Sequence, residues 1–455
     1  MSTILTPDLC VVGGGSGGLS LAAGAVQMGA TVVLLEGHKM GGDCLNYGCV
    51  PSKALLAAAK VPGIEFSAAK DRVAKVIAGI APHDSVERFT ELGVQVIEAY
   101  GEFINPREMK AGDYIIRPRR FVLATGSSPF VPPIPGLDGV PYHTNETLFD
   151  DHTRPDHLLI IGAGPIGMEM AQAHVRLGSK VTVLEGLKAL GRDDPELAAI
   201  VLDKLRAEGV EIVEDAKVSA VSGKAGDITL TLDDGRSFQG DQLLVAVGRR
   251  ANISKLNLEA GEITAERGSI KVNAGLRSSN KRVYAIGDVA GGLQFTHVAS
   301  YHAGLVIRSA LFGLPAKASD AHIPKVTYTE PELASVGLSE VESREKYGDK
   351  LEVLRAPYAE NDRARATGQT DGMVKVFAVK GRPVGAAIAG VQAGELIQIW
   401  ALAISAKLKL SAVAGMVSPY PTLGELNKRA AGSYFTPRLF ESVWVKRIVR
   451  LVQRF

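Results

Sequence analysis

Residues 9–36 read LCVVGGGSGGLSLAAGAVQMGATVVLLE, an apolar run, a glycine-rich loop, a helix-like stretch and a second apolar run that ends in an acid. Residues 158–185 read LLIIGAGPIGMEMAQAHVRLGSKVTVLE and repeat the pattern. In both copies the acid, Glu36 or Glu185, follows the first glycine of the loop by 23 residues. Two matched copies indicate a repeated βαβ unit rather than two unrelated tight turns.

Each copy has the residues that a dinucleotide-binding βαβ unit requires. The loop glycines are Gly13, Gly15 and Gly18 in the first copy and Gly162, Gly164 and Gly167 in the second. The first glycine permits the tight turn, the second lets the backbone approach a pyrophosphate, and the third lets the helix pack on the strand. The acid at the end of each copy then binds ribose hydroxyls. Because the carboxylate of Glu185 would repel the 2′-phosphate of NADPH, the second copy predicts NADH as the cofactor. NADPH stays possible, since Lys188 and Arg192 follow and could attract that phosphate.

Length and composition limit the class of protein. The 455 residues are 46% hydrophobic and 22% charged, a globular profile long enough for about three domains. A formal net charge of +2 gives no reason to expect nucleic acid as a partner. We find no apolar stretch of membrane-spanning length and no signal-like N-terminus, so a cytoplasmic protein is expected.

Two of the three cysteines lie close together, in the stretch GGDCLNYGCVPSK at residues 41–53. In an ideal helix, residues five apart have Cα atoms roughly 8 to 9 Å apart, beyond the limit of about 7 Å for a disulfide. Cys44 and Cys49 can therefore bridge only if the helix start is distorted, which Gly48 and Pro51 would permit. The alternatives are a labile redox disulfide and two buried structural thiols; Cys10, inside the first apolar run, is expected in the core.

Four segments carry a resemblance to a known family that covers nearly the full chain. They are the motif at residues 41–53, ATG at 124–126, VGR at 247–249 and AIGD at 285–288. The chain resembles the flavoprotein pyridine nucleotide-disulfide oxidoreductases, the family of dihydrolipoamide dehydrogenase and mercuric reductase. The resemblance implies an α/β fold with two Rossmann-like domains, which bind FAD and NAD(P), and a C-terminal α+β dimerisation domain. The domains expected are residues 1–150 and 271–320 for FAD, 151–270 for NAD(P), and 321–455 for dimerisation.

The resemblance also implies roles for individual residues. Cys49 would face the flavin as the charge-transfer thiol, Cys44 would exchange with substrate, and Lys53 would pair with Glu169 near the flavin. No metal site is expected. The cofactor-binding residues implied are Gly13, Gly15, Gly18, Glu36, Gly42, Lys53, Gly101, Thr125, Gly126, Asp288, Thr296, Gly162, Gly164, Gly167, Glu185 and Gly248.

One catalytic position departs from the family pattern. Relatives that reduce disulfides carry a His-Pro-Thr segment, contributed by the partner subunit of a homodimer, with a glutamate five residues after the histidine. Here Tyr420 replaces the histidine and Glu425 is retained. A phenol with an ordinary pKa near 10 is a poor base at pH 7. An aromatic residue before Pro421 also makes a cis peptide bond plausible.

Three functions therefore stay open. The first is an FAD enzyme that passes electrons from NADH through the Cys44–Cys49 disulfide to a small-molecule or protein disulfide. The second is a diaphorase that reduces a metal ion or quinone. The third is a flavin-bound redox sensor or assembly component.

The C-terminal tail has its own pattern. Phe440, Trp444, Ile448, Leu451 and Phe455 recur at helical spacing, while Lys446, Arg450 and Arg454 mark another face. The pattern predicts a basic amphipathic helix, which packs on the dimer or its own domain, or contacts a membrane surface or a partner.

Overall fold

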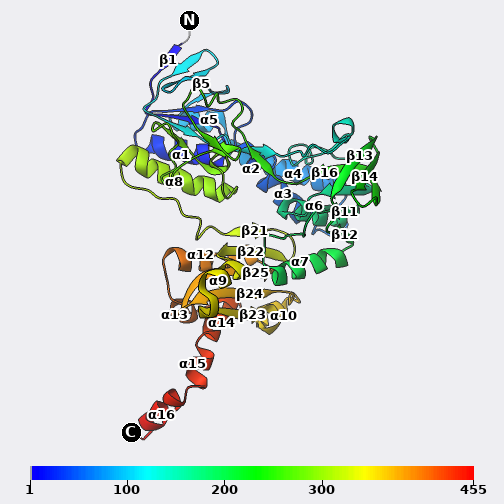
Figure 1. Cartoon of the computed structure of the whole chain (residues 1–455), viewed down its shortest axis with the longest axis vertical. Helices are drawn as coiled ribbons and strands as arrows, with labels where there is room; N and C mark the ends of the chain where they lie inside the picture. Colours follow the sequence, from blue (N-terminus) through cyan, green and yellow to red (C-terminus); the bar gives the residue numbers. More distant parts are fainter. Residues whose placement is uncertain (1–2, 455) are drawn as a thin grey trace. The chain divides into compact units, whose positions relative to one another are not determined.

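The computed structural model describes residues 3–454, so Phe455 lies outside the described residues (Figure 1). The chain divides into two compact units. The first comprises the described residues up to 162 together with 173–181 and 218–319, and the second comprises 163–172, 182–217 and 320 onward. Within residues 3–454, no helix has the length and apolar character needed to cross a membrane.

The first sheet of unit 1 contains the two strands of the first copy of the repeat, β2 and β3, and three strands from later in the chain. Its five strands lie in the order β20-β8-β2-β3-β4, and all the pairings are parallel. Strand β2 is buried along its whole length because it lies in the middle of the sheet. Helix α1 packs against α8, and Leu21, Ala22 and Ala25 of α1 are fully buried. The elements of this part are β2 (Leu9–Val12), α1 (Ser16–Gln27), β3 (Val32–Leu35), α2 (Gly42–Asn46), α3 (Cys49–Ala58), α4 (Phe66–Ile80), η1 (Ala81–Asp84), α5 (Val86–Glu91), β4 (Gln95–Ile97), β8 (Arg120–Leu123), β20 (Val283–Ala285), η3 (Gly287–Ala290) and α8 (Thr296–Phe312).

Smaller sheets complete the first unit. A four-stranded sheet has the order β1-β7-β6-β5, a three-stranded antiparallel sheet has the order β13-β14-β15, and β9 pairs with β17. Their elements are β1 (Thr3–Leu5), β5 (Glu102–Asn105), β6 (Glu108–Ala111), β7 (Tyr114–Ile116), β9 (Ser127–Pro129), η2 (Leu137–Gly139), β13 (Val218–Lys224), β14 (Asp227–Leu232), β15 (Ser237–Gly240), β17 (Arg249–Ala251), β18 (Ala265–Glu266) and β19 (Ser269–Ile270).

The second copy of the repeat forms a four-stranded sheet of order β12-β11-β10-β16. Strands β10 and β16 pair in parallel, with Leu158 opposite Gln242. Helix α6 begins at Pro165, a residue that suits a first helical position because its missing N–H would have no partner there. The elements are β10 (His157–Ile161), α6 (Pro165–Arg176), β11 (Lys180–Leu184), α7 (Pro195–Ala207), β12 (Val210–Val213) and β16 (Gln242–Val245).

The chain after residue 320 forms an antiparallel sheet of order β21-β22-β25-β24-β23, with helices packed against it. Trp400 is fully buried here, and its indole N–H donates to Asn427 Oδ1 at 2.7 Å. Two short helices, α11 and α12, follow β25 and contact it. The elements are β21 (Lys325–Thr327), β22 (Glu332–Gly337), α9 (Glu340–Tyr347), η4 (Gly348–Lys350), β23 (Leu351–Pro357), η5 (Tyr358–Glu360), α10 (Asp362–Ala366), β24 (Met373–Val379), β25 (Arg382–Gly390), α11 (Ala393–Leu396), α12 (Gln398–Ser405), α13 (Leu410–Ala414) and α14 (Glu425–Ser433).

A buried lysine joins three carboxylates of unit 2. Lys375 Nζ, on β24, lies 2.7 Å from Asp194, 2.9 Å from Glu196 and 2.8 Å from Glu340. Only 3% of its side chain is exposed. Burial lowers the pKa of Lys375, but the three hydrogen bonds outweigh burial and raise that pKa above its ordinary value. Lys375 therefore stays charged, and the three carboxylates around it compensate its buried charge.

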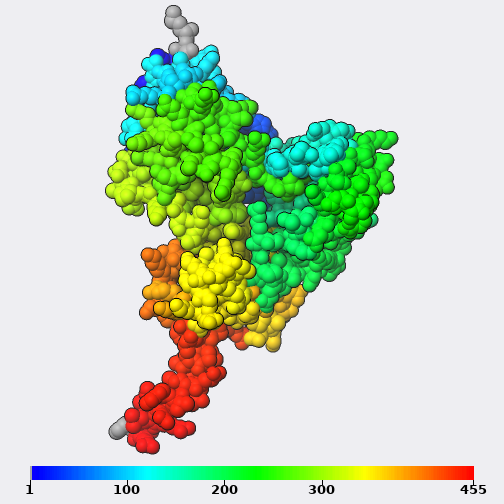
Figure 2. All heavy atoms as spheres, in the orientation of Figure 1, coloured from blue at the N-terminus to red at the C-terminus, as the bar shows by residue number. Residues whose placement is uncertain are grey.

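The chain ends in two short helices, α15 (Thr436–Phe440) and α16 (Val443–Val452), which extend from α14 in Figures 1 and 2. The basic amphipathic helix that the sequence predicts is present as α16, but it begins at Val443 and does not include Phe440, because Ser442 caps it by accepting from the Val445 N–H. The amphipathic character that the sequence predicts lies in α16, which has no buried residue.

Candidate functional site

The glycine loop of the first copy is packed so closely against neighbouring backbone that it leaves no space for side chains at Gly13 and Gly18. A Cβ at Gly13, where φ is +112°, would lie 2.4 Å from the Ala124 carbonyl oxygen, and one at Gly18 would lie 1.8 Å from the Gly13 oxygen. A Cβ at Gly42 would meet Gly15 Cα at 2.7 Å. Helix α1 begins without a side-chain cap, so its first N–H groups are available to an anion. This cradle fits the pyrophosphate of FAD.

The two acids of the repeat are held in the same way. Glu36 Oε2 accepts from the Gly14 N–H at 2.6 Å, and its Oε1 accepts from the His38 N–H at 2.7 Å. In the second copy, Glu185 Oε2 accepts from the Ala163 N–H at 2.8 Å, and its Oε1 accepts from Leu187 at 3.0 Å.

The donors occupy equivalent positions in the two copies, one residue after the first glycine and two residues after the acid. Each carboxylate is therefore fixed beside its loop, where the ribose of a dinucleotide would bind. Gly162 has φ +107° and its missing Cβ would lie 2.6 Å from the Ala246 oxygen, while Gly164 borders open space and Gly167 is buried in α6.

The two cysteines lie on different helices. Cys44 is in α2, and Cys49 is the first residue of α3. The helix is interrupted at Tyr47 and Gly48, so the distortion that a Cys44–Cys49 bridge requires is present. Both cysteines are free thiols, as in the reduced form of a dithiol pair, while Cys10 is buried as expected.

The surroundings of the cysteine pair shift the pKa values of the two thiols in opposite directions. The hydrogen bond from Cys44, with smaller contributions from Thr296 and Lys53, lowers the pKa of Cys49 to about 6, although burial opposes it. The same hydrogen bond and burial raise the pKa of Cys44 far above its ordinary range. Thr296 Oγ1, at the start of α8, lies 3.4 Å from Cys49 Sγ. At neutral pH, the pair is therefore one thiolate, Cys49, beside one thiol, Cys44.

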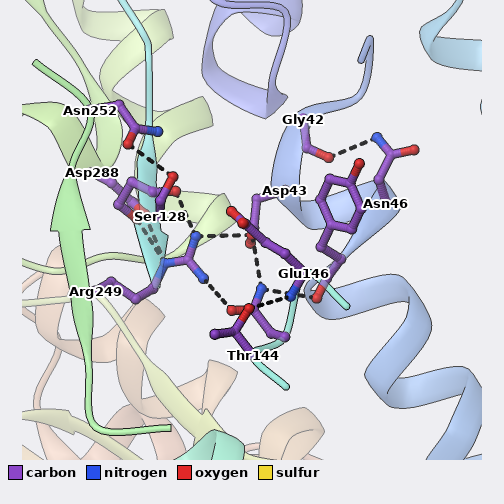
Figure 3. Close-up of polar contacts among 12 residues, drawn as sticks. Gly42, Asp43, Asn46, Ser128, Thr144, Glu146, Arg249, Asn252 and Asp288 are labelled. Carbon is purple, nitrogen blue, oxygen red and sulfur yellow. Dashed lines mark hydrogen bonds and ion pairs between the residues drawn. The ribbon is translucent and has the colours of Figure 1, made fainter. Parts of the chain in front are cut away.

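A polar network surrounds the residue before Cys44 (Figure 3). Arg249 Nη2 lies 3.0 Å from Asp43 Oδ1, and Asn145 Nδ2 donates to the same oxygen at 3.0 Å. Arg249 Nε donates to Ser127 Oγ at 2.7 Å, and this hydroxyl donates to Asp288 Oδ2 at 2.5 Å. The network thereby connects α2 to β9, β17 and η3 in unit 1.

The sequence does not predict four residues of this network as site residues: Asp43, Ser127, Asn145 and Arg249. Arg249 follows Gly248 in a segment that carried the resemblance, but its contacts join parts of the chain that lie far apart in sequence. The carboxylate of Asp43 raises the pKa of both cysteines, so it belongs to their electrostatic surroundings.

The other predicted cofactor residues of unit 1 differ in what they contact. Burial raises the pKa of Asp288, and Ser127 and Arg249 oppose that shift. Thr125 Oγ1 donates to the Asn252 carbonyl at 2.7 Å. Gly126 and Gly248 have φ of +67° and +142°. A Cβ at Gly101 would lie 2.5 Å from Met109 Sδ and 2.8 Å from Leu35 Cδ1, so packing favours a glycine here, and its role in cofactor binding stays a prediction.

The predicted pairing of Lys53 with Glu169 stays a prediction. Lys53 Nζ donates to Ser52 Oγ at 3.3 Å, in the helix that begins at Cys49. Glu169 is buried and its Oε1 accepts from the Tyr328 N–H at 2.9 Å.

Tyr420 is exposed, and its hydroxyl donates to Asp362 Oδ2 at 3.0 Å. This hydrogen bond raises the pKa of Tyr420 above 10. The phenol therefore acts as a donor and not as a base near neutral pH. The Tyr420–Pro421 peptide is cis, as expected, and Glu425 begins α14.

Comparison with known proteins agrees with this architecture. Residues 7–303 match the family model described as pyridine nucleotide-disulphide oxidoreductase, and residues 323–431 match its dimerisation domain. The chain belongs to the pyridine nucleotide-disulphide oxidoreductase family. The predicted fold class is confirmed, and the chain is an FAD-dependent enzyme of this family.

Individual relatives are about one-third identical. A mercuric reductase from Streptomyces lividans is 34% identical over 94% of this chain and 96% of its own length. One from Lysinibacillus sphaericus is 33% identical over 93% of this chain and 82% of its own. The solved HOCl-induced flavoprotein disulfide reductase RclA from Escherichia coli, as a Cu(II) complex, is 30% identical, with a TM-score of 0.86 over 92% of this chain and 98% of its own.

Proposed function

We propose that this enzyme uses NADH to reduce the Cys44–Cys49 pair and that the resulting dithiol reduces a disulfide-type acceptor. The observation that carries the proposal is the placement of Cys44 in α2 and Cys49 at the start of α3, across the helix interruption that a bridge requires, with Thr296 Oγ1 3.4 Å from Cys49 Sγ. FAD, when bound, supplies the two-electron transfer between nicotinamide and thiols. Overall, NADH and one proton reduce one disulfide to two thiols.

The preference for NADH rests on the surroundings of Glu185. Its carboxylate is fixed by two backbone N–H groups, so it stands as a negative charge beside the second glycine loop. Lys188, which could attract a 2′-phosphate, has its Nζ 2.6 Å from Asp215 Oδ2. The cation is therefore engaged, and the site favours a free 2′-hydroxyl.

The acceptor step depends on how Cys44 loses its proton. Cys44 would attack the acceptor disulfide, and Cys49 would then displace the reduced acceptor and restore the intramolecular disulfide. Because the pKa of Cys44 is raised and Tyr420 is not a base near neutral pH, the proton of Cys44 would pass to solvent, which makes the attack slow at pH 7. In the homodimer that the dimerisation domain supports, we propose that Tyr420 and Glu425 of one subunit complete the acceptor pocket of the other.

A thiophilic metal ion is the second candidate acceptor. The observation that favours it is the hydrogen bond from Tyr420 to Asp362, which leaves no phenolate to act as the base. Binding of the ion to two cysteines would displace their protons to solvent, so no separate base is required. The names of the relatives, mercuric reductase and a Cu(II) complex of RclA, agree with this chemistry. Within residues 3–454, no cluster of three or more His, Cys, Asp or Glu side chains is arranged to hold a metal ion.

The test is NADH oxidation by the FAD-loaded enzyme with lipoamide or with Cu(II) as acceptor. The native enzyme should reduce lipoamide, Tyr420→His should reduce it faster at pH 7, and Cys44→Ser should abolish the reaction. If the native enzyme reduces Cu(II) but reduces lipoamide only as Tyr420→His, the metal ion is the acceptor. If Cys44→Ser retains full activity with both acceptors, the thiol relay is wrong.

A further inference from the structure

Helix α16 presents an apolar face that nothing in the described residues of unit 2 buries. All of its residues are exposed or half-buried, and the exposed fraction is 72% for Trp444 and 58% for Ile448. The helix lies beyond residue 431, where the match to the dimerisation domain of the family ends. It therefore lies outside the part of the chain that the family models match.

The side chains of this tail are sorted by chemistry. At about 100° per residue, the apolar side chains occupy one arc of the helix and the cations occupy the opposite arc. The apolar arc consists of Trp444, Val445, Ile448, Val449, Leu451 and Val452. The cationic arc consists of Lys446, Arg447, Arg450 and Arg454, with Val443 among them.

Charge decides which occupant fits this face. Residues 443–454 hold four cations and no acid. None of these cations forms an ion pair with another described residue of the chain. Two copies of α16 packed through their apolar arcs would bury those arcs but leave the cations of both copies facing outward, with no acid of the helix to pair with them. A lipid surface with anionic headgroups buries the apolar arc and attracts the cations.

We propose that α16 lies in the surface of an anionic lipid membrane, with its apolar arc in the acyl region and its cations among the headgroups. Trp444, at one edge of the apolar arc, takes the position at the headgroup boundary that indole rings prefer. The proposal concerns the location of the enzyme and does not depend on its acceptor.

Tryptophan fluorescence of the full-length, FAD-loaded enzyme tests the proposal. The chain has two tryptophans, and Trp400 is fully buried, so a blue shift on lipid addition reports Trp444. Vesicles of 30% phosphatidylglycerol in phosphatidylcholine should give the shift, and vesicles of pure phosphatidylcholine should not. K446Q/R450Q should bind about thirty-fold more weakly, since each cation near an anionic surface contributes a factor of about five.

A matched pair of variants tests the face. Val443 and Val452 are both 60% exposed, but Val443 lies on the cationic arc and Val452 on the apolar arc. Val452→Ser should weaken vesicle binding about fivefold, whereas Val443→Ser should leave it unchanged. NADH oxidation should be native in every variant, which shows that each is folded.

Three results would overturn the proposal. The first is equal binding to the two kinds of vesicle or to neither. The second is an equal loss for Val443→Ser and Val452→Ser. The third is a decrease in the oligomeric mass of Val452→Ser by light scattering, which would assign the face to a second copy of the chain.

Discussion

The low pKa of Cys49 depends mainly on the hydrogen bond from Cys44, so replacing Cys44 tests the electrostatic description of the site. Serine keeps a hydroxyl that can donate to Cys49, whereas alanine keeps no donor. Without the donor, the remaining favourable contributions of Thr296 and Lys53 compete with burial and with Asp43. We therefore expect an apparent pKa near 6 for Cys49 in Cys44→Ser, and one near the ordinary value of about 8.5 or higher in Cys44→Ala.

The expected difference in reactivity is largest in mild acid. At pH 5.5, a thiol of pKa 6 is about 24% thiolate and one of pKa 8.5 about 0.1%, a ratio of about 240. The more basic thiolate is intrinsically about tenfold more nucleophilic, since reactivity rises with pKa at a slope of about 0.4. Alkylation of Cys49 should therefore be about twentyfold slower in Cys44→Ala than in Cys44→Ser.

Iodoacetamide labelling followed by mass spectrometry of the Cys49 peptide measures this rate from pH 4 to 10. Cys10, the other remaining cysteine, is fully buried and its pKa is raised, so it should not interfere. The thiolate is lost as the pH falls through the pKa, so labelling of Cys44→Ser should decline only below about pH 6. If the labelling rates of the two variants depend on pH in the same way, with a midpoint above pH 8, the hydrogen bond from residue 44 is not the cause of the low pKa of Cys49.

Other predictions follow from unit 2. Glu185→Ala should improve kcat/KM for NADPH relative to NADH by about tenfold, because the charge that repels the 2′-phosphate is removed; an unchanged ratio in steady-state assays would contradict the role of Glu185. Lys375→Met should lower the free energy of unfolding by about 3–5 kcal/mol, because Asp194 and its neighbouring carboxylates lose their shared cation. Urea denaturation measures this free energy. A decrease below 1 kcal/mol would show that water solvates the carboxylates when the lysine is removed. Raising the pH from 7 to 9 should speed lipoamide reduction by the native enzyme more than by Tyr420→His, because Cys44 is deprotonated without a base only at high pH; parallel pH profiles would contradict this.

The sequence was informative where the signal is local. The glycine loops and the acids Glu36 and Glu185 were predictable, because fixed spacing in a βαβ unit places them together. The need for a distorted helix between Cys44 and Cys49 also followed from helix geometry alone. In each case the relevant contacts join residues of one short segment.

The rest depends on contacts between distant segments or on a single local cap. The ion pair of Arg249 with Asp43 requires β17 to lie beside α2, which no spacing in the sequence reveals. Periodicity extended the C-terminal helix back to Phe440, but the cap at Ser442 ends that continuity. At Gly101 the resemblance predicts a cofactor role, whereas the close contact with Met109, which the sequence does not reveal, is a second reason for a glycine there.

The interruption of the helix at Tyr47 and Gly48 has a consequence for stability. A disulfide between Cys44 and Cys49 would close a loop of only about six residues, so it would constrain the unfolded chain by about 2 kcal/mol, against nearly 5 kcal/mol for a loop of about 100 residues. Opening such a bond removes little of the free energy that keeps the domain folded. The pair can therefore alternate between dithiol and disulfide in every turnover while the melting temperature of the enzyme changes little.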